Sequence, residues 1–249
     1  MLTIISPAKS QDFISPVPSG MPTGIPLFPT KTESLIKICK GFSIEEIKYL
    51  MDVSDKLAEL NFYRYQNFET QPEKPAIYAY DGDVYHHIKR EGFSDVQWRF
   101  LQEHTLIISG LYGALRPLDK IKPYRLEMST KNLSLSDFWQ PTLTAYVNQT
   151  LANHQNQYLV NLASTEYSSS INEHDLKYPM INIAFKENRN NKLVVVGINA
   201  KKARGTMFNF IAEKLIDIPQ ALHKFSPLGY QYSQDQSSAN NWVFILNKP

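Results

Sequence analysis

The sequence predicts an α+β protein with a mixed central sheet flanked by helices in one compact domain. First, aliphatic and β-branched runs bounded by turn residues recur along the chain and predict strands, at Leu2 to Ile5, 105–109, 158–162 and 180–186. Second, longer segments with apolar residues at helical spacing separate these runs. Third, the 249 residues are 43% hydrophobic and contain no evident linker beyond one early proline-rich stretch, which favours a single domain over residues 1–249.

Composition excludes several classes of protein. The formal net charge of +2 is too small to indicate a nucleic-acid binder without local clustering of cations. Cys39 is the sole cysteine, so no intramolecular disulfide can form, which suits a reducing cytosol. The amino-terminal residues lack a signal-peptide pattern, and the longest apolar run, Leu193 to Ile198, is too short to cross a bilayer. We expect a soluble cytoplasmic protein with no membrane partner.

The first segments are a strand, a loop and a helix. Ser6-Pro7 ends the strand candidate at Leu2 to Ile5. Residues 15–29 are rich in proline and predict a surface loop, either ordered or flexible. Residues 32–40 then carry apolar side chains on one helical face.

Residues 43–63 predict two short helices joined by a tight turn. Ser43 and Glu46 form a capping-box pattern for the first helix, and Ser54 is a favourable N-cap for the second. The apolar frame of this segment resembles the helix-hairpin-helix motif of DNA-repair proteins. The alternative is a plain helical hairpin that packs on the core.

Asp52 and Ser54 stand where the helix-hairpin-helix motif has glycines. Those glycines let backbone N–H groups approach a phosphate, whereas a carboxylate at Asp52 repels it. Lys56 and Arg64 in the second helix supply compensating positive charge.

Residues 75–80 predict a strand that ends at the turn signal Asp81-Gly82-Asp83. Two histidines follow, His86 and His87, but neither their spacing nor that of the two acids matches a metal-binding motif, so we expect no metal and no cofactor. Residues 94–104 predict the next helix, with Ser94 as its N-cap.

The stretch from Thr105 to Met128 predicts a buried strand that opens into a basic loop with two glycines. Its cations are Arg116, Lys120, Lys122 and Arg125. Loops beyond strand ends often hold ligands in α/β proteins, and backbone N–H groups at glycines can cradle phosphate. An ordinary surface loop with solvated cations is the alternative.

The carboxyl-terminal half predicts a long helix over residues 135–153, a strand at 158–162, a hairpin of strands at 180–186 and 192–199, a helix at 206–216 and a last strand at 242–246. A second basic cluster, Ala200 to Gly205, falls at the junction between the hairpin and the following helix.

The sequence therefore offers a set of candidate phosphate-binding residues near element ends: Lys9, Ser54, Lys56, Arg116, Arg125, Lys201, Lys202 and Arg204. If these converge, a positive cleft is compatible with the small net charge. Tyrosines 85, 112 and 124 lie beside them in sequence and are candidates for stacking on bases. Dispersed, solvated cations are the alternative.

Several strings in this sequence resemble the YaaA peroxide-stress family of bacteria. The two most specific are SGLYGALRPLD at Ser109 to Asp119 and PYRLEM at Pro123 to Met128. The others occur in the family's order: ISPAK at 5–9, SDKLA at 54–58, GDVY at 82–85, NLAS and EY at 161–167, and AKKARG at 200–205. The resemblance implies a cytosolic protein of mixed α and β structure, associated with peroxide resistance and with limiting free intracellular iron. It also implies DNA binding through a positive cleft and a helix-hairpin-helix element.

Two functional hypotheses follow. The first is a non-enzymatic protein that binds double-stranded or distorted DNA without sequence preference through phosphate contacts. The second is an enzyme that acts on a nucleotide, a nucleobase or a nucleic-acid end, with a small phosphorylated ligand held by the cations. Its candidate acids, bases or metal ligands are Asp55, Asp81, Asp83 and Glu127.

Overall fold

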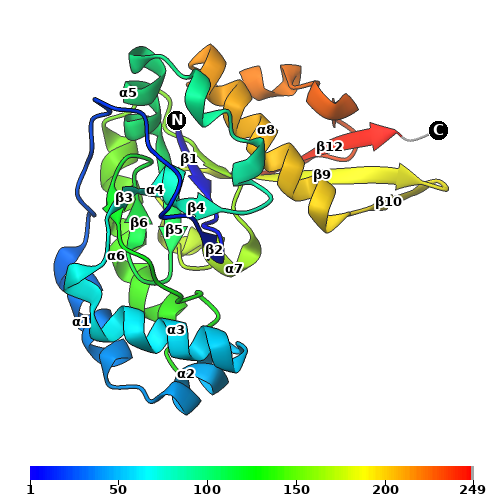
Figure 1. The fold of residues 1–249 in the computed structure, drawn as a ribbon. Helices are drawn as coiled ribbons and strands as arrows, with labels where there is room; N and C mark the ends of the chain where they lie inside the picture. Colours follow the sequence, from blue (N-terminus) through cyan, green and yellow to red (C-terminus); the bar gives the residue numbers. More distant parts are fainter. Residues whose placement is uncertain (248–249) are drawn as a thin grey trace.

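The computed structural model describes residues 1–247 and builds them around one eight-stranded sheet (Figure 1). The strand order is β11-β12-β9-β8-β1-β5-β6, and β10 pairs with β9 off this path. The strands from β12 to β5 run parallel to one another, whereas β11, β6 and β10 are antiparallel to their neighbours. The sheet comprises β1 (Leu2–Ile5), β5 (Thr105–Ser109), β6 (Gly113–Leu115), β8 (Leu159–Asn161), β9 (Met180–Arg189), β10 (Lys192–Val194), β11 (Tyr230–Ser233) and β12 (Asn241–Asn247).

Helices and two small sheets surround this central sheet. The helices are α1 (Pro29–Lys40), α2 (Ile44–Met51), α3 (Asp55–Gln66), α4 (Ala76–Ala79), α5 (Asp95–His104), α6 (Leu135–Ala152), α7 (Thr165–Ser168) and α8 (Gly197–Lys214). Short 3-10 helices include η2 (Tyr85–His87) and η5 (Pro219–Lys224). The small sheets pair β2 (Ser10–Gln11) with β4 (Tyr80–Asp81) and β3 (Lys74–Pro75) with β7 (Lys120–Ile121). The predicted mixed α and β fold in one compact domain is confirmed.

The sheet places the start and the end of β1 in different surroundings. All four residues of β1 are buried, as expected of a strand covered on both faces. In the sheet, β5 lies on one side of β1, whereas β8 and then β9 lie on the other side. The carboxyl ends of β1 and β8 therefore lie at a topological switch point, where α/β sheets form ligand crevices.

The prediction of a strand at residues 75–80 is wrong. Ala76–Ala79 form the short helix α4, and only the residues on either side of it, in β3 and β4, pair with other strands. Ala76, Ile77, Tyr78 and Ala79 are all buried. A short apolar run that is buried on every side has no periodicity to distinguish a helix from a strand.

The predicted strand at residues 192–199 is confirmed only for its first three residues. A two-residue turn at Asn190 and Asn191, both with positive φ, joins β9 to β10 as in tight hairpins. Helix α8 then begins at Gly197, so the cluster of Ala200 to Gly205 lies inside a helix and not in a loop before one. Helical spacing consequently places Lys201 and Arg204 on one face and Lys202 on another.

The helical hairpin of α2 and α3 is present. The capping box of Ser43 and Glu46 is confirmed, with the Ser43 hydroxyl accepting a hydrogen bond from the Glu46 backbone N–H at 3.2 Å. Asp52 adopts the left-handed conformation, with a φ of 50°, that a glycine takes at such a helix end. Ser54 occupies the N-cap of α3 but makes no capping hydrogen bond with its side chain.

No helix within residues 1–247 is both long enough and apolar enough to span a membrane.

Candidate functional site

A cavity of about 460 Å³ lies at the carboxyl ends of β1 and β8. Four segments line it: the loop after β1 with Ser6 and Lys9, the turn from Asp81 to His86, the residues after β8 including Ser164, Glu166 and Tyr167, and helix α8 with Lys201 and Arg204. Figure 1 shows β1 running from the amino terminus towards β2 and α7, on the side of the molecule that also holds α2 and α3. The volume falls within the range of small-molecule sites.

Hydrogen bonds fix the floor of this cavity. The Ser6 hydroxyl donates to the Ser164 hydroxyl at 3.3 Å and accepts from the Ser164 backbone N–H at 2.8 Å. The Tyr85 hydroxyl donates to the Ser6 carbonyl at 2.8 Å. The loops after β1 and β8 and the 3-10 helix η2 are thereby held to one another.

Helix α8 packs closely against the residues that follow Asp83. A Cβ atom on Gly205 would overlap the Val84 carbonyl oxygen and would lie 3.0 Å from the His87 Cβ. The Asn209 side chain donates to the His87 carbonyl at 2.6 Å and accepts from the Lys89 backbone N–H at 2.9 Å. The glycine and the asparagine together bring Lys201 and Arg204 to the wall of the cavity.

The two cations of α8 are in different electrostatic situations. Lys201 Nζ lies 3.0 Å from Asp83 Oδ2, and this hydrogen bond, reinforced by the charge of Lys201, holds the pKa of Asp83 below its usual value. Burial lowers the pKa of Arg204, whose Nε is buried and has no hydrogen-bond partner among residues 1–247. A desolvated guanidinium is stabilised by an anion, and it binds phosphate with more directional contacts than an ammonium group.

Lys9 connects this cavity to the helical hairpin. Lys9 Nζ lies 2.5 Å from Glu127 Oε2, and Arg125 Nη2 lies 2.8 Å from Glu127 Oε1. Both Lys9 and Glu127 also line a second cavity of about 260 Å³, which the turn residue Asp52 borders. Lys9 therefore borders both the cavity beside α8 and the cavity beside the turn between α2 and α3.

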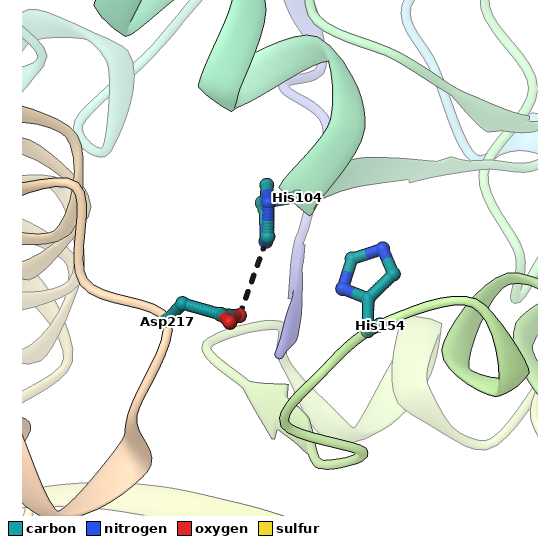
Figure 2. Close-up of side chains that lie close together, drawn as sticks. All are labelled: His104, His154 and Asp217. Atoms are coloured by element: carbon teal, nitrogen blue, oxygen red, sulfur yellow. Dashed lines mark ion pairs between the residues drawn. The ribbon is translucent and has the colours of Figure 1, made fainter.

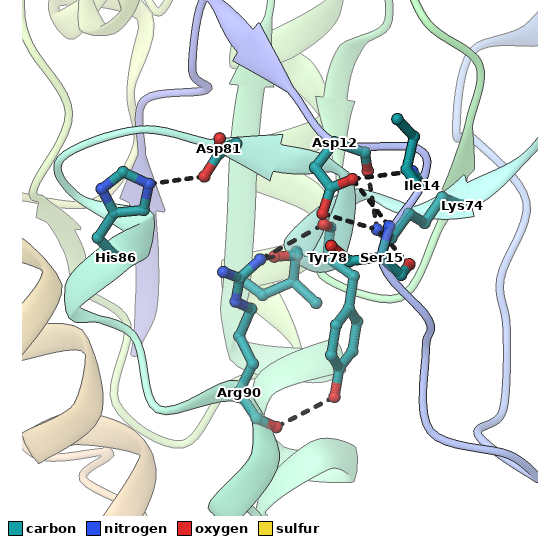
Figure 3. A network of polar contacts seen from close by, with 9 residues as sticks. Asp12, Ile14, Ser15, Lys74, Tyr78, Asp81, His86 and Arg90 are labelled. Atoms are coloured by element: carbon teal, nitrogen blue, oxygen red, sulfur yellow. Dashed lines mark hydrogen bonds and ion pairs between the residues drawn. The ribbon is translucent and has the colours of Figure 1, made fainter.

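An acid and a histidine face each other on the same wall. Figure 3 shows the His86 ring pointing at Asp81, with Nε2 at 2.6 Å from Oδ1. Both residues line the first cavity. Such a pair can exchange a proton with a ligand, as in general acid–base catalysis.

A neighbouring network supports the strands behind that wall. Figure 3 also shows Asp12 beside Lys74, whose buried Nζ donates to the carbonyls of Asp12 and Ser15 at 2.8 and 2.9 Å. Hydrogen bonds from Ser15 and Ile14 hold the pKa of Asp12 below its usual value. This network fixes the loop after β2. Strand β2 in turn pairs with β4, which contains Asp81.

The structure brings part of the predicted set together. Five of the predicted residues line the first cavity: Lys9, Asp81, Asp83, Lys201 and Arg204. Arg125 and Glu127 do not line the first cavity, but Glu127 contacts Lys9, and all three residues line an adjoining depression. Lys202 does not line these cavities.

The remaining predicted residues lie elsewhere. Arg116 contacts the buried Asp119, with Nη2 at 2.9 Å from Oδ1. Asp55 is exposed and lies 2.6 Å from Lys48 Nζ within the hairpin, where Ser54 and Lys56 are also exposed. Tyr85, Tyr112 and Tyr124 have buried rings, so they offer no face on which bases can stack.

The predicted set does not include Ser6, Ser164, Glu166, Tyr167 or His86, and from the sequence His86 was considered only as a metal ligand. Ser6 and Ser164 each follow the end of a strand, and that signal becomes informative only when β1 and β8 are known to be neighbours. Glu166 accepts hydrogen bonds from the Ser129 hydroxyl and backbone N–H at 2.8 and 3.1 Å. This contact joins α7 to the segment that follows Glu127.

The fold and this site define an α/β protein with a charged cavity at the switch point of a mostly parallel sheet. A family model described as peroxide stress protein YaaA matches residues 1–236, and the chain belongs to this family. UPF0246 proteins from three Rickettsia species are similar over nearly the whole chain. The protein from Rickettsia bellii (strain OSU 85-389) is 54% identical over 248 residues, which cover 98% of this chain and 100% of that protein.

The other two relatives give the same picture. The UPF0246 protein from Rickettsia africae (strain ESF-5) is 51% identical over 247 residues, which cover 98% of this chain and 99% of the relative. The protein from Rickettsia conorii (strain ATCC VR-613 / Malish 7) is 50% identical with the same coverage. The family resemblance noted in the sequence is confirmed.

Proposed function

We propose that this member of the peroxide-stress family binds DNA without sequence preference in the cytoplasm, along the surface from α8 to the α2–α3 hairpin. Duplex or distorted DNA is the partner, and its phosphates are the contacted groups. The protein thereby protects DNA, or assists its repair, during peroxide stress, and its activity is associated with a lower level of free intracellular iron.

One observation carries this proposal. Arg204 lines a cavity, its guanidinium Nε is buried without a hydrogen-bond partner, and it has no carboxylate partner among the described residues. Lys201 lies one turn before it on the same helical face and contacts an exposed carboxylate, which competes only weakly with a phosphate. Two adjacent cations on one helix face suit the spacing of a phosphate chain.

The hairpin supports the same surface from its other end. The turn between α2 and α3 borders the cavity of about 260 Å³, and Lys9 lines both this cavity and the first one at the end of β1. The left-handed conformation of Asp52 matches a glycine position of the helix-hairpin-helix motif. The Ser54 side chain does not cap α3, and Lys56 is exposed, so the backbone N–H groups at the start of α3 and the Lys56 ammonium group can contact a phosphate.

Fluorescence anisotropy of a labelled duplex across a salt series tests the proposal. We expect log affinity to fall linearly with log salt, and we expect Lys201→Glu and Lys56→Glu each to weaken binding and to reduce the slope by about 1. Lys192→Glu in β10 makes the same charge change away from this surface and serves as the control. Absence of binding at low salt, or equal losses in all three variants, would contradict the proposal.

A second candidate function is an enzyme that acts on a nucleotide, a nucleobase or a nucleic-acid end in the first cavity. The pair of His86 and Asp81, at 2.6 Å, favours it because this pair faces the same cavity as Arg204. In this arrangement Arg204 and Lys201 hold the phosphate, and His86 with Asp81 transfers a proton.

Turnover assays separate the two candidates. Nucleotides and short oligonucleotides with 5′- or 3′-phosphates are incubated with the wild type and with Asp81→Asn and Asp83→Asn. The enzyme hypothesis expects turnover that these substitutions abolish. The binder hypothesis expects no turnover, together with DNA affinity that is unchanged or increased by Asp83→Asn because Lys201 loses its competing carboxylate.

The cellular part of the proposal is tested in a deletion strain. We expect higher sensitivity to hydrogen peroxide and more free iron, measured by electron paramagnetic resonance of chelated iron, than in the parent. Complementation with Lys201→Glu is expected to fail if DNA binding underlies the phenotype. Full rescue by that variant would separate the cellular role from the proposed surface.

A further inference from the structure

Two histidines and an aspartate meet at the end of β1 that lies opposite the cavity. His104 is the last residue of α5, His154 follows α6, and Asp217 follows α8. Figure 2 shows the three side chains directed towards one another around the start of β1. Within residues 1–247, this is the one group of three or more His, Cys, Asp or Glu side chains whose donor atoms all lie within 4.8 Å of one another.

The backbone of Met1 lies among these side chains. Its carbonyl oxygen is 2.8 Å from His104 Nδ1 and 3.1 Å from His154 Nδ1, and His104 Nδ1 is 3.4 Å from Asp217 Oδ1. Donor atoms bound at about 2.1 Å to one ion lie about 3.0 Å apart in octahedral and about 3.4 Å apart in tetrahedral geometry. These three separations are close to the edges of a coordination polyhedron, and the donor atoms of the three side chains all lie within 4.8 Å of one another.

Neighbouring residues hold the three side chains in place. The His104 ring stacks on Phe100 with centroids 4.2 Å apart and an angle of 15° between the planes. The Asn156 side chain donates to Asp217 Oδ2 at 3.0 Å, whereas Oδ1 faces His104 and the Met1 amino group. Such outer contacts orient the ligands in protein metal sites.

We propose that His104, His154 and Asp217 bind one divalent transition-metal ion, with the Met1 carbonyl oxygen as a further ligand. Two imidazoles, a carboxylate and a carbonyl oxygen form a ligand set that suits Zn²⁺ or Co²⁺. Both imidazoles coordinate through Nδ1, which requires the tautomer that carries its proton on Nε2. This site is distinct from the proposed DNA-binding surface, and its existence does not depend on that function.

The proposed ion ties three helix ends to the first strand of the sheet. A ligand that binds the folded state alone raises stability, in proportion to the logarithm of its concentration relative to the dissociation constant. We therefore expect the ion to protect β1, α5 and the segment after α8 against unfolding. The alternative is that the same side chains only clamp β1 through hydrogen bonds and the ion pair between Asp217 and the Met1 amino group.

The test titrates the full-length, metal-free protein with Co²⁺ and Zn²⁺. We expect one equivalent of Co²⁺ to give visible d–d absorption, Zn²⁺ to displace it, and the melting temperature to rise by several degrees. Asp217→Asn, which keeps the side-chain shape, and His154→Ala are each expected to lower the affinity by about 100-fold, since loss of an outer contact alone costs about 10–100-fold. His174→Ala removes an exposed histidine outside the cluster and is expected to bind as the wild type does.

Nuclear magnetic resonance identifies the ligands even if His154→Ala fails to fold. Co²⁺ should broaden or shift the imidazole signals of His104 and His154 in the wild type and leave that of His174 unchanged. Absence of binding at millimolar metal, or affinity that Asp217→Asn leaves unchanged, would overturn the proposal. Either outcome would assign the cluster to clamping the first strand alone.

Discussion

Two basic segments of the chain look alike in sequence and have different roles in the fold. Arg116 in the first segment forms a hydrogen-bonded pair with Asp119, whose side chain is 0% exposed, and donates to the Ile25 carbonyl at 3.2 Å. Arg204 in the second segment lines a cavity and has a buried Nε without a partner within residues 1–247. Arg116 also borders a cavity, of about 490 Å³, but Asp119 and the Ile25 carbonyl engage its guanidinium and hold the proline-rich loop to the domain. The Arg204 Nε has no such partner within residues 1–247.

The difference shows that the count of cations in a segment is a weak indicator of a site. What distinguishes the segments is whether an acid of the same loop neutralises the cation. In the first segment the acid follows three residues later and its carboxylate also accepts from the Arg116 backbone N–H at 2.8 Å. The face of α8 that carries Lys201 and Arg204 has no acid of its own. The acid that pairs with Lys201 is Asp83, which comes from a distant part of the chain.

Arg116→Met is expected to have the largest effect on stability. It leaves the buried Asp119 carboxylate without its cation, and breaking such a pair costs roughly 3 kcal/mol or more. Urea unfolding measures the loss. Lys120→Met removes a half-exposed cation of the same segment, 4.0 Å from Glu73, and is expected to change stability by less than about 0.5 kcal/mol.

The pH dependence of this variant sharpens the same point. Burial raises the pKa of Asp119 even beside Arg116, and removal of the guanidinium should raise it further. The folded state then binds a proton that the unfolded state, with its ordinary carboxyl pKa, does not bind at the same pH. Stability of Arg116→Met relative to the wild type should therefore recover as the pH falls from 8 towards 5. A constant difference over this range would show that Asp119 keeps another partner.

Gly205→Ala is expected to cause the second-largest loss of stability. The added Cβ overlaps the Val84 carbonyl, so α8 must shift from the cavity wall. Overpacking of this kind costs about 1–3 kcal/mol, and the shift should also weaken DNA binding. Gly197→Ala in the same helix meets no atom within 4 Å and should leave both stability and binding near the wild-type values. A loss in Gly197→Ala as large as that in Gly205→Ala would contradict this account, because alanine has the higher helix propensity and meets no atom at position 197.

Asp83→Asn is expected to change binding and not folding. The substitution frees Lys201 from its carboxylate, so affinity for duplex DNA should rise a few-fold at low salt and the salt dependence should steepen. The Asp83 side chain is exposed, and its loss should leave the melting temperature within about a degree. Asp235→Asn makes the same charge change at another exposed position. An equal rise in both variants would point to net charge alone.

Asp52→Gly should have the smallest effect. A glycine adopts the left-handed conformation of this position without strain, and its greater freedom in the unfolded chain offsets that gain, so stability should stay within about 0.5 kcal/mol. Loss of the carboxylate should increase DNA affinity slightly. Asp52→Val places a β-branched residue in the same conformation and should be clearly destabilised. Equal stability of the glycine and valine variants would contradict the role assigned to the backbone here.

Local patterns in the sequence predicted much of the fold. The strand at Leu2 to Ile5, the capping boxes at Ser43 and Ser94, and the long helix from Leu135 are all present. Each of these depends on interactions between residues a few positions apart. The failures at residues 76–79 and 195–199 occur where burial on all sides or a short edge strand obscures the period.

The site was less predictable because it depends on contacts between distant segments. Lys201 and Asp83 are both in the predicted set, yet their 3.0 Å contact joins residues 118 positions apart. Ser6 and Ser164 meet only because β8 lies beside β1. The cluster of His104, His154 and Asp217 has no local motif, since its three members lie in separate loops and helix ends.

The most direct test replaces both arginines in the same way. Binding of one labelled duplex is measured across a salt series for Arg204→Met and Arg116→Met, at a temperature at which circular dichroism shows both variants to be folded. We predict that Arg204→Met weakens binding and reduces the salt slope by about 1, whereas Arg116→Met binds as the wild type does. Equal affinities for the two variants would contradict the proposal that α8 forms part of a DNA-binding surface.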